Sequence, residues 1–448
     1  MKQRTSHAVV LGGGLAGMLA AKVLAEHVDR VTVVERDDLA ADPLARDGLP
    51  QHRHAHLLPA SGAHALEALL PGVVDALVHA GAHRLALPTD LLALTPAGWQ
   101  RRFPGRRFAL TCTRGLVDRQ VRRRVFVEPD VELLDATEAT GLLGGAGRVT
   151  GVRLRDRRGG GAGALRADLV VDATGRDART PGWLAAIGAP APGAEVVDRG
   201  VVCASLLFTA PASARTGFPA VTTALDPRSG GRASLLTPVE DGRWLITLVA
   251  AAGVEPPSDE AGFADFARAL PSPLVAELVA AAEPDGDVHL SRATANRRLR
   301  PERTPEGFLV LGDALSAVNP VHAHGMATAA RSALALRDEL RAHGLTAGAQ
   351  RALTRAARPA WTTATTLDRL AAGPADPGGL TRLRLALSRR LTAATRPPGA
   401  DLPGSAAGLA HPGVLSALLR GTPPGGAGAA PPFTAEERAT HPFLGAGR

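Results

Sequence analysis

The sequence predicts an α/β fold with a parallel-sheet domain built from three separate stretches of chain. This domain carries an inserted mixed β-sheet domain and is followed by a helical C-terminal region. Three observations lead to this prediction. The chain opens with a strand, a glycine-rich turn, a helix and a second strand, the order of a βαβ unit. Strand-and-turn motifs return near residues 172 and 312. Between them, short strand-like segments predominate from about residue 190 to residue 291.

The composition is that of a folded protein of about two or three domains. Of its 448 residues, 45% are hydrophobic, which is too many for a disordered chain. The net charge of +8 comes almost entirely from scattered arginines, since Lys2 and Lys22 are the only lysines, and aromatic residues make up 3%. We therefore expect no nucleic-acid partner. No apolar stretch reaches the roughly 20 residues of a membrane span, so we expect no stable membrane insertion.

The cysteines point to a reducing compartment. Cys112 and Cys203 lie far apart in the sequence and suggest neither a disulfide framework nor a zinc site. Proteins in oxidising compartments use disulfides more often. We therefore expect a cytoplasmic protein.

The first part of the chain alternates between predicted strands and helices. Strands are predicted where apolar and β-branched residues run together, and helices where apolar residues recur every three or four positions. The predicted strands are His7–Leu11, Arg30–Glu35, Asp130–Leu134, Thr137–Leu143, Val149–Arg155 and Leu165–Ala173, and the predicted helices are Leu15–His27, Ser61–Leu70 and Arg114–Val127. The glycine loops Gly144–Gly147 and Gly159–Gly163 each lie between two strands, which favours hairpin connections over nucleotide loops.

The inserted domain and the C-terminal region give further elements. Strands are predicted at Val201–Phe208, Ala233–Pro238 and Arg243–Val249, with a helix near Ala261–Ala269. A buried strand at Phe308–Leu311 and a helix at Gly325–His343 follow. Beyond them we predict a helix at Leu380–Leu391 and a flexible Pro/Gly-rich tail at Thr422–Pro432.

The glycines of the first turn follow a Rossmann-like dinucleotide-binding pattern. Gly12 permits the tight turn, Gly14 lets the backbone approach a pyrophosphate, and Gly17 allows the helix to pack closely on the strand. The helix N-terminus attracts the phosphate charge. Glu35 ends the second strand, where its carboxylate is placed to bind an adenosine ribose.

Two later motifs add to this pattern. They are Asp172-Ala173-Thr174-Gly175-Arg176 and Gly312-Asp313-Ala314, the latter followed by Asn319-Pro320 and His324-Gly325-Met326. With the first motif, in this order, they resemble the single-component FAD-dependent monooxygenases of the para-hydroxybenzoate hydroxylase fold. The segments 48–56, 112–114 and 319–326 look most like the actinobacterial olefin epoxidases of polyether-ionophore biosynthesis. The resemblance covers residues 7–345.

The resemblance implies a domain organisation. Residues 1–75, 110–185 and 295–345 would form a discontinuous, GR2-type FAD-binding domain. Residues 76–109 and 186–294 would form the substrate-binding β-sheet domain, and residues 346–448 the helical C-terminal region.

The resemblance also implies a cofactor site. Asp313 would bind a ribityl hydroxyl, Pro320 would pack near the isoalloxazine, and the N–H groups of Gly325 and Met326 would face its N1/C2=O edge. The positive end of the helix that begins there would stabilise anionic reduced flavin. Arg53 and His54 would lie beside the flavin and Arg114 near the pyrophosphate. The expected FAD-binding residues are Gly12, Gly14, Leu15, Ala16, Gly17, Glu35, Arg36, Arg53, His54, Arg114, Ala139, Thr174, Gly175, Gly312, Asp313, Pro320, Gly325 and Met326.

The activity implied is that of an olefin epoxidase. NAD(P)H would bind transiently and reduce FAD, and O2 would give a C4a-(hydro)peroxyflavin that epoxidises an alkene of a hydrophobic polyketide or polyene, free or carrier-bound. The alternatives within the same broad group are a redox-neutral FAD-bound cyclase and an FAD-dependent double-bond reductase. Because the cofactor carries such chemistry, no side chain is assigned as catalytic with certainty. His54, His322 and His324 are the candidates near the flavin.

The histidines are the main departure and the main open point. The family usually has Tyr-Gly before the residue at His324, whereas this chain has His322-Ala323. His52, His54 and His56 also alternate, but no Asp, Glu or Cys lies at ligand spacing, so no metal is expected. The sequence leaves the oligomeric state open.

Overall fold

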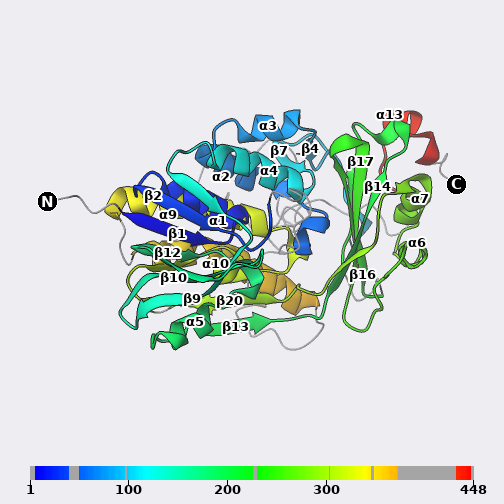
Figure 1. The fold of residues 1–448 in the computed structure, drawn as a ribbon. Helices are drawn as coiled ribbons and strands as arrows, with labels where there is room; N and C mark the ends of the chain where they lie inside the picture. Colours follow the sequence, from blue (N-terminus) through cyan, green and yellow to red (C-terminus); the bar gives the residue numbers. More distant parts are fainter. Residues whose placement is uncertain are drawn as a thin grey trace, which may run out of the picture.

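The molecule consists of two lobes that lie side by side (Figure 1). The structure is a computed structural model, and it describes residues 6–39, 50–95, 98–225, 230–301, 303–344, 348–371 and 430–444. The first lobe is built on a five-stranded sheet and the second on an eight-stranded mixed sheet. This architecture confirms the predicted α/β fold with an additional mixed sheet.

The sheet of the first lobe is parallel throughout. Its strand order is β21-β12-β1-β2-β8, and every neighbouring pair runs in the same direction. The bounds are β1 His7–Leu11, β2 Arg30–Val34, β8 Val131–Leu134, β12 Leu169–Asp172 and β21 Phe308–Val310. Ala8 to Leu11 are at most 1% exposed, as expected for a strand that is covered on both faces.

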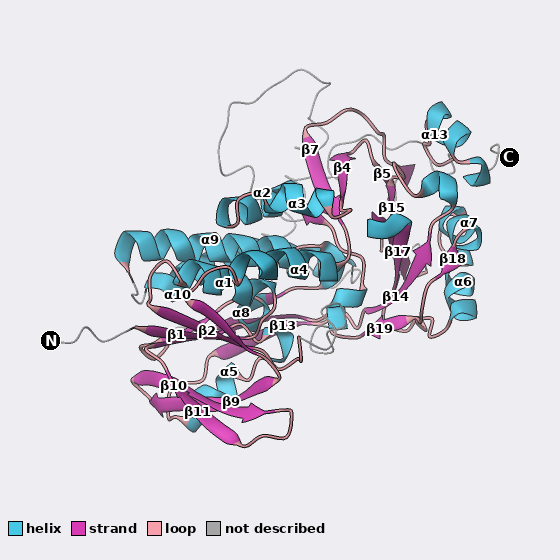
Figure 2. Cartoon of the chain, turned by 45° about the horizontal axis from the view of Figure 1, so that its top comes forward, coloured by secondary structure: helices cyan, strands magenta, loops and turns pink. Residues whose placement is uncertain are grey.

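The two faces of this sheet are covered differently (Figure 2). One face carries helices α1 (Leu15–Leu24), α4 (Arg114–Val125) and α9 (Gly325–His343). The other faces an antiparallel sheet of β9 (Thr137–Gly145), β10 (Arg148–Asp156) and β11 (Ala162–Arg166). Both predicted glycine hairpins are confirmed, because they join β9 to β10 and β10 to β11.

The single strand predicted at Leu165–Ala173 is wrong. The structure has two strands there, β11 and β12, which belong to different sheets. The chain leaves the antiparallel hairpin after Arg166 and enters the parallel sheet at Leu169. Strand-forming residues on both sides of Asp168 do not reveal such a change of partner.

The large sheet of the second lobe has one face covered by helices (Figure 1). Its order is β18-β14-β17-β16-β15-β5-β6, with β19 paired to β14. Leu206, Phe208 and Ile246 pack with Phe263 of the covering helix α6 (Glu260–Arg268) in one core. Alternate residues of a strand point to opposite faces, so Ser205 and Thr247 lie on the other face. The bounds are β5 Leu91–Thr95, β6 Gly98–Trp99, β14 Val202–Thr209, β15 Ala220–Thr223, β16 Arg232–Val239, β17 Arg243–Ala250, β18 Glu283–Pro284, β19 His289–Ser291 and, for the second covering helix, α7 Leu274–Ala281.

The remaining elements are short. Two short sheets pair β3 and β4 with β7, and β13 with β20. Their bounds, with those of the remaining helices, are α2 Ala60–Leu69, α3 Val73–His79, α5 Thr180–Ala186, α8 Asp313–Ser316, β3 Leu58–Pro59, β4 His83–Leu87, β7 Arg107–Thr111, β13 Gly193–Val197 and β20 Asn296–Arg300.

The C-terminal region contacts both lobes. Helix α10 (Gly348–Ala371) packs against α9, whereas residues 430–444, the C-terminal segment, lie on the second lobe with helix α13 (Ala435–Thr440). Phe433 and Phe443 of this segment approach Phe218 with ring centroids 6.3 and 6.2 Å away. Arg102 donates two hydrogen bonds to the carboxylate of Glu437, at 2.6 and 2.5 Å. The C-terminal segment is thereby part of the second lobe.

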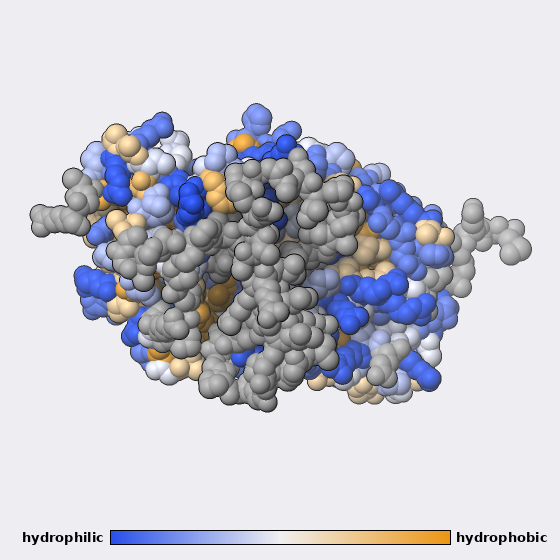
Figure 3. All heavy atoms as spheres, turned by 180° about the vertical axis from the view of Figure 1, so that it is seen from behind, coloured by the Kyte–Doolittle hydropathy of each residue, from blue (hydrophilic) through white to orange (hydrophobic). Residues whose placement is uncertain are grey.

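Some predictions cannot be compared with the structure. The predicted helix Leu380–Leu391 lies outside the described residues, as does the predicted tail Thr422–Pro432 up to residue 429. Within the described ranges, no single helix is long and apolar enough to cross a membrane, although α2 and α3 would qualify as a pair bent by 115°. Hydrophobic side chains on the described surface form small separate patches when the molecule is seen from behind (Figure 3).

We expect Arg102→Ala to lower the free energy of unfolding by about 2–3 kcal/mol, because it removes charge-assisted hydrogen bonds at a largely buried position. Urea unfolding followed by circular dichroism measures this value. Arg268→Ala is the matched control, since its partner Asp265 is as exposed as Arg268 itself, and we expect a change below about 0.5 kcal/mol. Equal losses in the two variants would contradict the role given to the C-terminal segment.

Candidate functional site

A cleft lies at the carboxyl ends of β1, β2 and β12. Ligands of open parallel sheets bind at this edge. Seven of the predicted residues line the cleft, and they come from four separate stretches of chain. The predicted residues in the cleft are Gly12, Gly14, Glu35, Arg36, Ala139, Thr174 and Gly175.

The glycine turn fits its surroundings so closely that two of its glycines cannot be replaced. Gly12 has φ +101°, and a Cβ there would lie 2.6 Å from the carbonyl oxygen of Ala173. A Cβ on Gly17 would lie 1.9 Å from the carbonyl oxygen of Gly12. The backbone N–H of Gly12 donates to Val34 at 2.7 Å. This turn therefore joins β1 to both neighbouring strands.

The N-terminus of α1 opens at this turn. Gly14 is the N-cap residue, and it offers no side-chain acceptor to the first N–H groups of the helix, at Leu15 and Ala16. The first turn also contains no acidic residue. Such an end is suited to a phosphate group, which supplies both the acceptor atoms and the negative charge.

Glu35 is fixed by the backbone around it. It is 4% exposed, and its carboxylate accepts hydrogen bonds from the N–H groups of Gly13 at 2.8 Å and Asp37 at 3.0 Å. The predicted position beside the cleft agrees with the structure, while the contribution of Glu35 to the glycine turn was not foreseen.

The second motif is held by a buried carboxylate. Asp172 is fully buried and accepts hydrogen bonds from the N–H and hydroxyl of Thr174 and from the hydroxyl of Thr180. Burial raises the pKa of Asp172, and these hydrogen bonds oppose the rise. The turn that follows β12 therefore presents Thr174 and Gly175 to the cleft in a fixed position.

Eight cleft residues lie outside the predicted set. Three of them, Leu11, Val34 and Ala173, are strand-end residues beside the predicted ones. The other five carry both charges and one indole ring: Thr137 and Glu138 begin β9, and Asp177, Arg179 and Trp183 follow the second motif. No spacing rule singles these five out, because the packing of β9 on β2 and of α5 on β9 brings them to the cleft.

The third motif packs directly on the first. Gly312 has φ +63°, and a Cβ there would lie 2.6 Å from the Cβ of Ala16. Asp313 follows at the start of α8, where its carboxylate lies 3.5 Å from Nε of Arg176. The motifs at residues 12–17, 172–176 and 312–314 therefore meet at one place.

The loop 319–326 is tied to α10 by one carboxylate. Asp368 is 5% exposed and accepts hydrogen bonds from Nε2 of His322 at 2.8 Å, from Nδ2 of Asn319 at 3.2 Å and from Nδ2 of Asn296. Burial would raise the pKa of Asp368, but the hydrogen bonds from His322, Asn296 and Asn319 outweigh it and lower the pKa. Sequence reasoning missed Asp368 because it lies in a helix outside every motif.

This loop ends where α9 begins. Ala323 has φ +54° and ψ +35°, a left-handed conformation that Gly adopts without cost, and Gly is the residue that the resembling family has there. The rings of His322 and His324 lie 6.3 Å apart. A Cβ on Gly325 would meet open space, and Met326 is buried in the next position of α9. Pro320 begins the turn before them.

Eleven of the predicted residues do not line the cleft, and three of these have partners elsewhere in the molecule. Arg114 begins α4, is buried, and is paired with Asp118 at 2.9 Å. A guanidine nitrogen of Arg53 lies 3.0 Å from the ring nitrogens of His289 in β19. His54 is 4% exposed, and its Nδ1 lies 2.7 Å from Oγ of Ser205 in β14. Both residues of the His-rich loop therefore face the second lobe.

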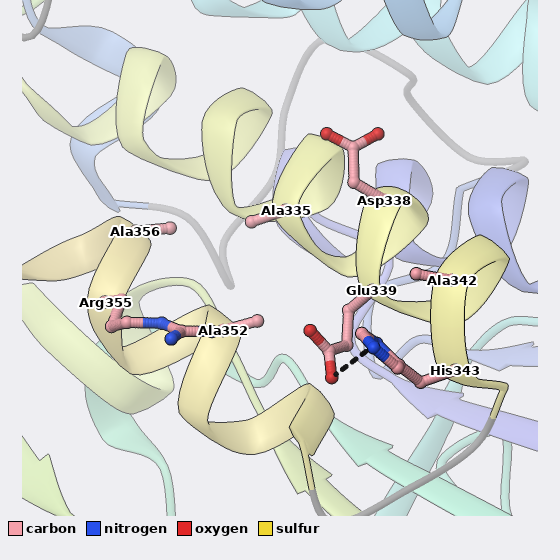
Figure 4. Close-up of a pocket in the computed structure, with 8 residues that line it drawn as sticks. All are labelled: Ala335, Asp338, Glu339, Ala342, His343, Ala352, Arg355 and Ala356. Atoms are coloured by element: carbon pink, nitrogen blue, oxygen red, sulfur yellow. Dashed lines mark ion pairs between the residues drawn. The ribbon is translucent and has the colours of Figure 1, made fainter. Parts of the chain in front are cut away.

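A second hollow lies between α9 and α10 (Figure 4). The alanines Ala335, Ala342, Ala352 and Ala356 line it, and Glu339 is paired with His343 at 3.4 Å beside them. Short side chains at a helix crossing explain this space. No group of three metal-ligating side chains comes together among the residues that the structure describes.

One family model and one relative match most of this chain. The model of the family described as FAD binding domain matches residues 5–360. Protein Rv3254 of Mycobacterium tuberculosis is 34% identical over 382 residues, which cover 79% of this chain and 78% of that protein.

Solved structures share the fold at low sequence identity. PqsL of Pseudomonas aeruginosa, a probable FAD-dependent monooxygenase, has 20% identity and a TM-score of 0.61, covering 85% of this chain and 99% of PqsL. The flavin-dependent brominase Bmp2 has 16% identity and a TM-score of 0.64, covering 85% of this chain and 92% of Bmp2. The oxygenase of 2-methyl-3-hydroxypyridine-5-carboxylic acid has 18% identity and a TM-score of 0.57, covering 86% of this chain and 93% of that chain.

We expect Gly12→Ala to bind FAD at least tenfold more weakly, because the new methyl group collides with backbone and requires a strained φ. Fluorescence titration of the apoprotein with FAD measures the dissociation constant. Gly147→Ala is the matched control, since a Cβ at this hairpin glycine meets nothing within 4 Å. A normal FAD affinity in Gly12→Ala would contradict the assignment of the cleft.

We expect Asp368→Asn to lower the free energy of unfolding by about 2–3 kcal/mol, because an amide cannot accept all the hydrogen bonds that converge on this carboxylate. Chemical denaturation of the two proteins at pH 7 gives the difference. Asp338→Asn on α9 should leave stability unchanged, since the Asp338 side chain is 69% exposed. If both substitutions cost the same, the network around Asp368 does not stabilise the loop.

Proposed function

Since this chain belongs to the FAD binding domain family, we propose that it is a flavin-dependent monooxygenase that epoxidises an alkene of a polyketide or polyene intermediate. FAD is its cofactor. The observation that carries the proposal is the meeting of three distant motifs: the first two line one cleft, which has the form of a dinucleotide site, and the third packs against the first. The flavin-dependent oxygenases that share the fold support the reaction class.

The residues of the site fit FAD. The turn at Gly12 and the uncapped start of α1 would hold the pyrophosphate, and Glu35 would receive the ribose hydroxyls. The open space at Gly325 leaves room for a flat ring system beside the first N–H groups of α9. Asp313, at the start of α8, would accept a hydrogen bond from the ribityl chain.

The second lobe would border the site of a hydrophobic substrate. The face of the large sheet that turns away from α6 and α7 carries Cys203, Leu235 and Val249, with Ser205 and Thr247 among them. The His-rich loop covers part of this face through His54 and Ala55, so we expect the substrate at its margin. The composition of this face is mainly aliphatic with a few hydroxyl groups, which suits a long hydrocarbon chain bearing occasional oxygen atoms. The epoxidase interpretation is supported by this composition and by the resemblance of the loops at 48–56 and 319–326.

Bound FAD would supply the transfer of electrons from NAD(P)H and the activation of O2. The protein would bind and orient the substrate and keep water out of the site. The nicotinamide nucleotide would bind only transiently, because the chain carries a single nucleotide fingerprint. His322 would occupy the position where the family usually has Tyr, and its ring is fixed by the hydrogen bond from Nε2 to the carboxylate of Asp368.

The test uses purified protein loaded with FAD, NADPH or NADH, ¹⁸O-labelled O2 and a linear triene acid, offered free and as its N-acetylcysteamine thioester. We expect an epoxide that contains one ¹⁸O atom, detected by mass spectrometry. Gly12→Ala is the negative control. A product that forms without NAD(P)H and O2 would instead identify a cyclase, and a saturated product a reductase.

A further inference from the structure

A buried chain of hydrogen bonds runs from the His-rich loop into the large sheet. The N–H of Ala55 donates to Oγ1 of Thr247 at 2.8 Å. Oγ1 of Thr247 lies 2.6 Å from Oγ of Ser205, which lies 2.7 Å from Nδ1 of His54. Ser205 and Thr247 are directly opposite each other on β14 and β17. All three side chains are at least nine-tenths buried.

The first bond sets the direction of the whole chain. A backbone N–H only donates, so Thr247 accepts from Ala55 and has its own hydroxyl hydrogen left to give. That hydrogen goes to Ser205, whose hydroxyl hydrogen then goes to Nδ1 of His54. Each buried hydroxyl hydrogen thereby finds an acceptor.

The opposite direction leaves a buried hydrogen without a partner. If Nδ1 of His54 donated to Ser205, and Ser205 to Thr247, the hydroxyl hydrogen of Thr247 would need another acceptor. The described part of the chain provides none within hydrogen-bond distance of that oxygen. A buried hydroxyl without an acceptor is costly, so the first direction is favoured.

His54 is electrically neutral in this environment. Burial, followed by the charges of His56, His289 and His52, lowers the pKa of His54 to about 3. A neutral imidazole carries one hydrogen. Because Nδ1 accepts the bond from Ser205, that hydrogen is on Nε2.

Nε2 of His54 is buried and has no hydrogen-bond partner among the described residues. We propose that His54 is a fixed donor whose Nε2–H binds a carbonyl oxygen of a bound ligand. A neutral donor in a dry site suits a neutral carbonyl better than a phosphate or carboxylate. The flavin and an oxygenated substrate both offer such an oxygen. The proposal rests on the proposed function for the identity of these ligands.

The first experiment determines the hydrogen position without any reaction. ¹⁵N NMR of histidine-labelled protein, with and without FAD, distinguishes a protonated ring nitrogen from an unprotonated one. The His54 signals are identified by their loss in His54→Gln. We expect a protonated Nε2 and an unprotonated Nδ1 from pH 5 to pH 8. We expect Thr247→Val to remove the preference for a hydrogen on Nε2 of His54, and Thr237→Val on β16 to leave that preference unchanged. A protonated Nδ1 in the wild-type protein overturns the proposal.

The second experiment identifies the acceptor with two probes. One arm titrates apoprotein with FAD, and the other titrates FAD-loaded protein with 2-undecanone, each labelled with ¹³C at its carbonyl carbons and followed by infrared spectroscopy. We expect His54→Leu to weaken the binding of one probe about three- to tenfold and to raise its carbonyl frequency. His54→Gln, whose side-chain N–H replaces Nε2–H, should restore most of the binding affinity and most of the original carbonyl frequency.

The probe whose binding and carbonyl frequency change in His54→Leu is the ligand that carries the acceptor oxygen. A change with FAD alone places the acceptor on the flavin, and a change with 2-undecanone alone places it on the substrate. If neither arm changes in His54→Leu, the proposal is wrong. The NMR result does not depend on turnover, so a failure of the epoxidation test would leave the hydrogen position of His54 as a separate finding.

Discussion

The close approach of Gly12 to the carbonyl oxygen of Ala173 is the constraint on which the cleft depends. With no side chain at Gly12, the turn after β1 can lie directly against the turn after β12. Gly17 repeats the condition within the first motif, and Gly312 repeats it against Ala16. These three glycines thus allow three distant segments to pack closely together. The ligand edge of the sheet is built from main chain, which has a fixed shape and many N–H groups.

The parts of this fold that follow local patterns could be predicted from the sequence. β1 and α9 have the predicted bounds, because a buried apolar run and a regular helical period identify them. The glycine turn was also predictable, since its residues are required by backbone geometry. The division between β11 and β12 was not, because it depends on which strand each segment pairs with.

The parts of the site that depend on tertiary contact could not be predicted. Asp368 lies 46 residues from His322 and beyond the range matched by the family. Trp183 and Arg179 reach the cleft only through the packing of α5. His54 was expected beside the flavin, and the structure adds an anchor on the large sheet that no sequence pattern indicates. A ligand with a carbonyl oxygen and a hydrocarbon chain would contact His54 through the oxygen and the aliphatic side chains beside that sheet face through the hydrocarbon.

The distribution of aromatic residues has a practical consequence for spectroscopy. The chain has no tyrosine and four tryptophans, so its near-ultraviolet emission comes from indole rings alone. Trp183 lines the cleft, and Trp244 lies fully buried beside the C-terminal segment. Trp361 is on α10, where the guanidinium of Arg298 stacks on its ring. These three rings belong to different regions of the molecule, whereas Trp99 lies in the same core as Trp244. Proteins that retain one tryptophan at a time would give separate optical signals for ligand entry, for release of the C-terminus and for movement of α10.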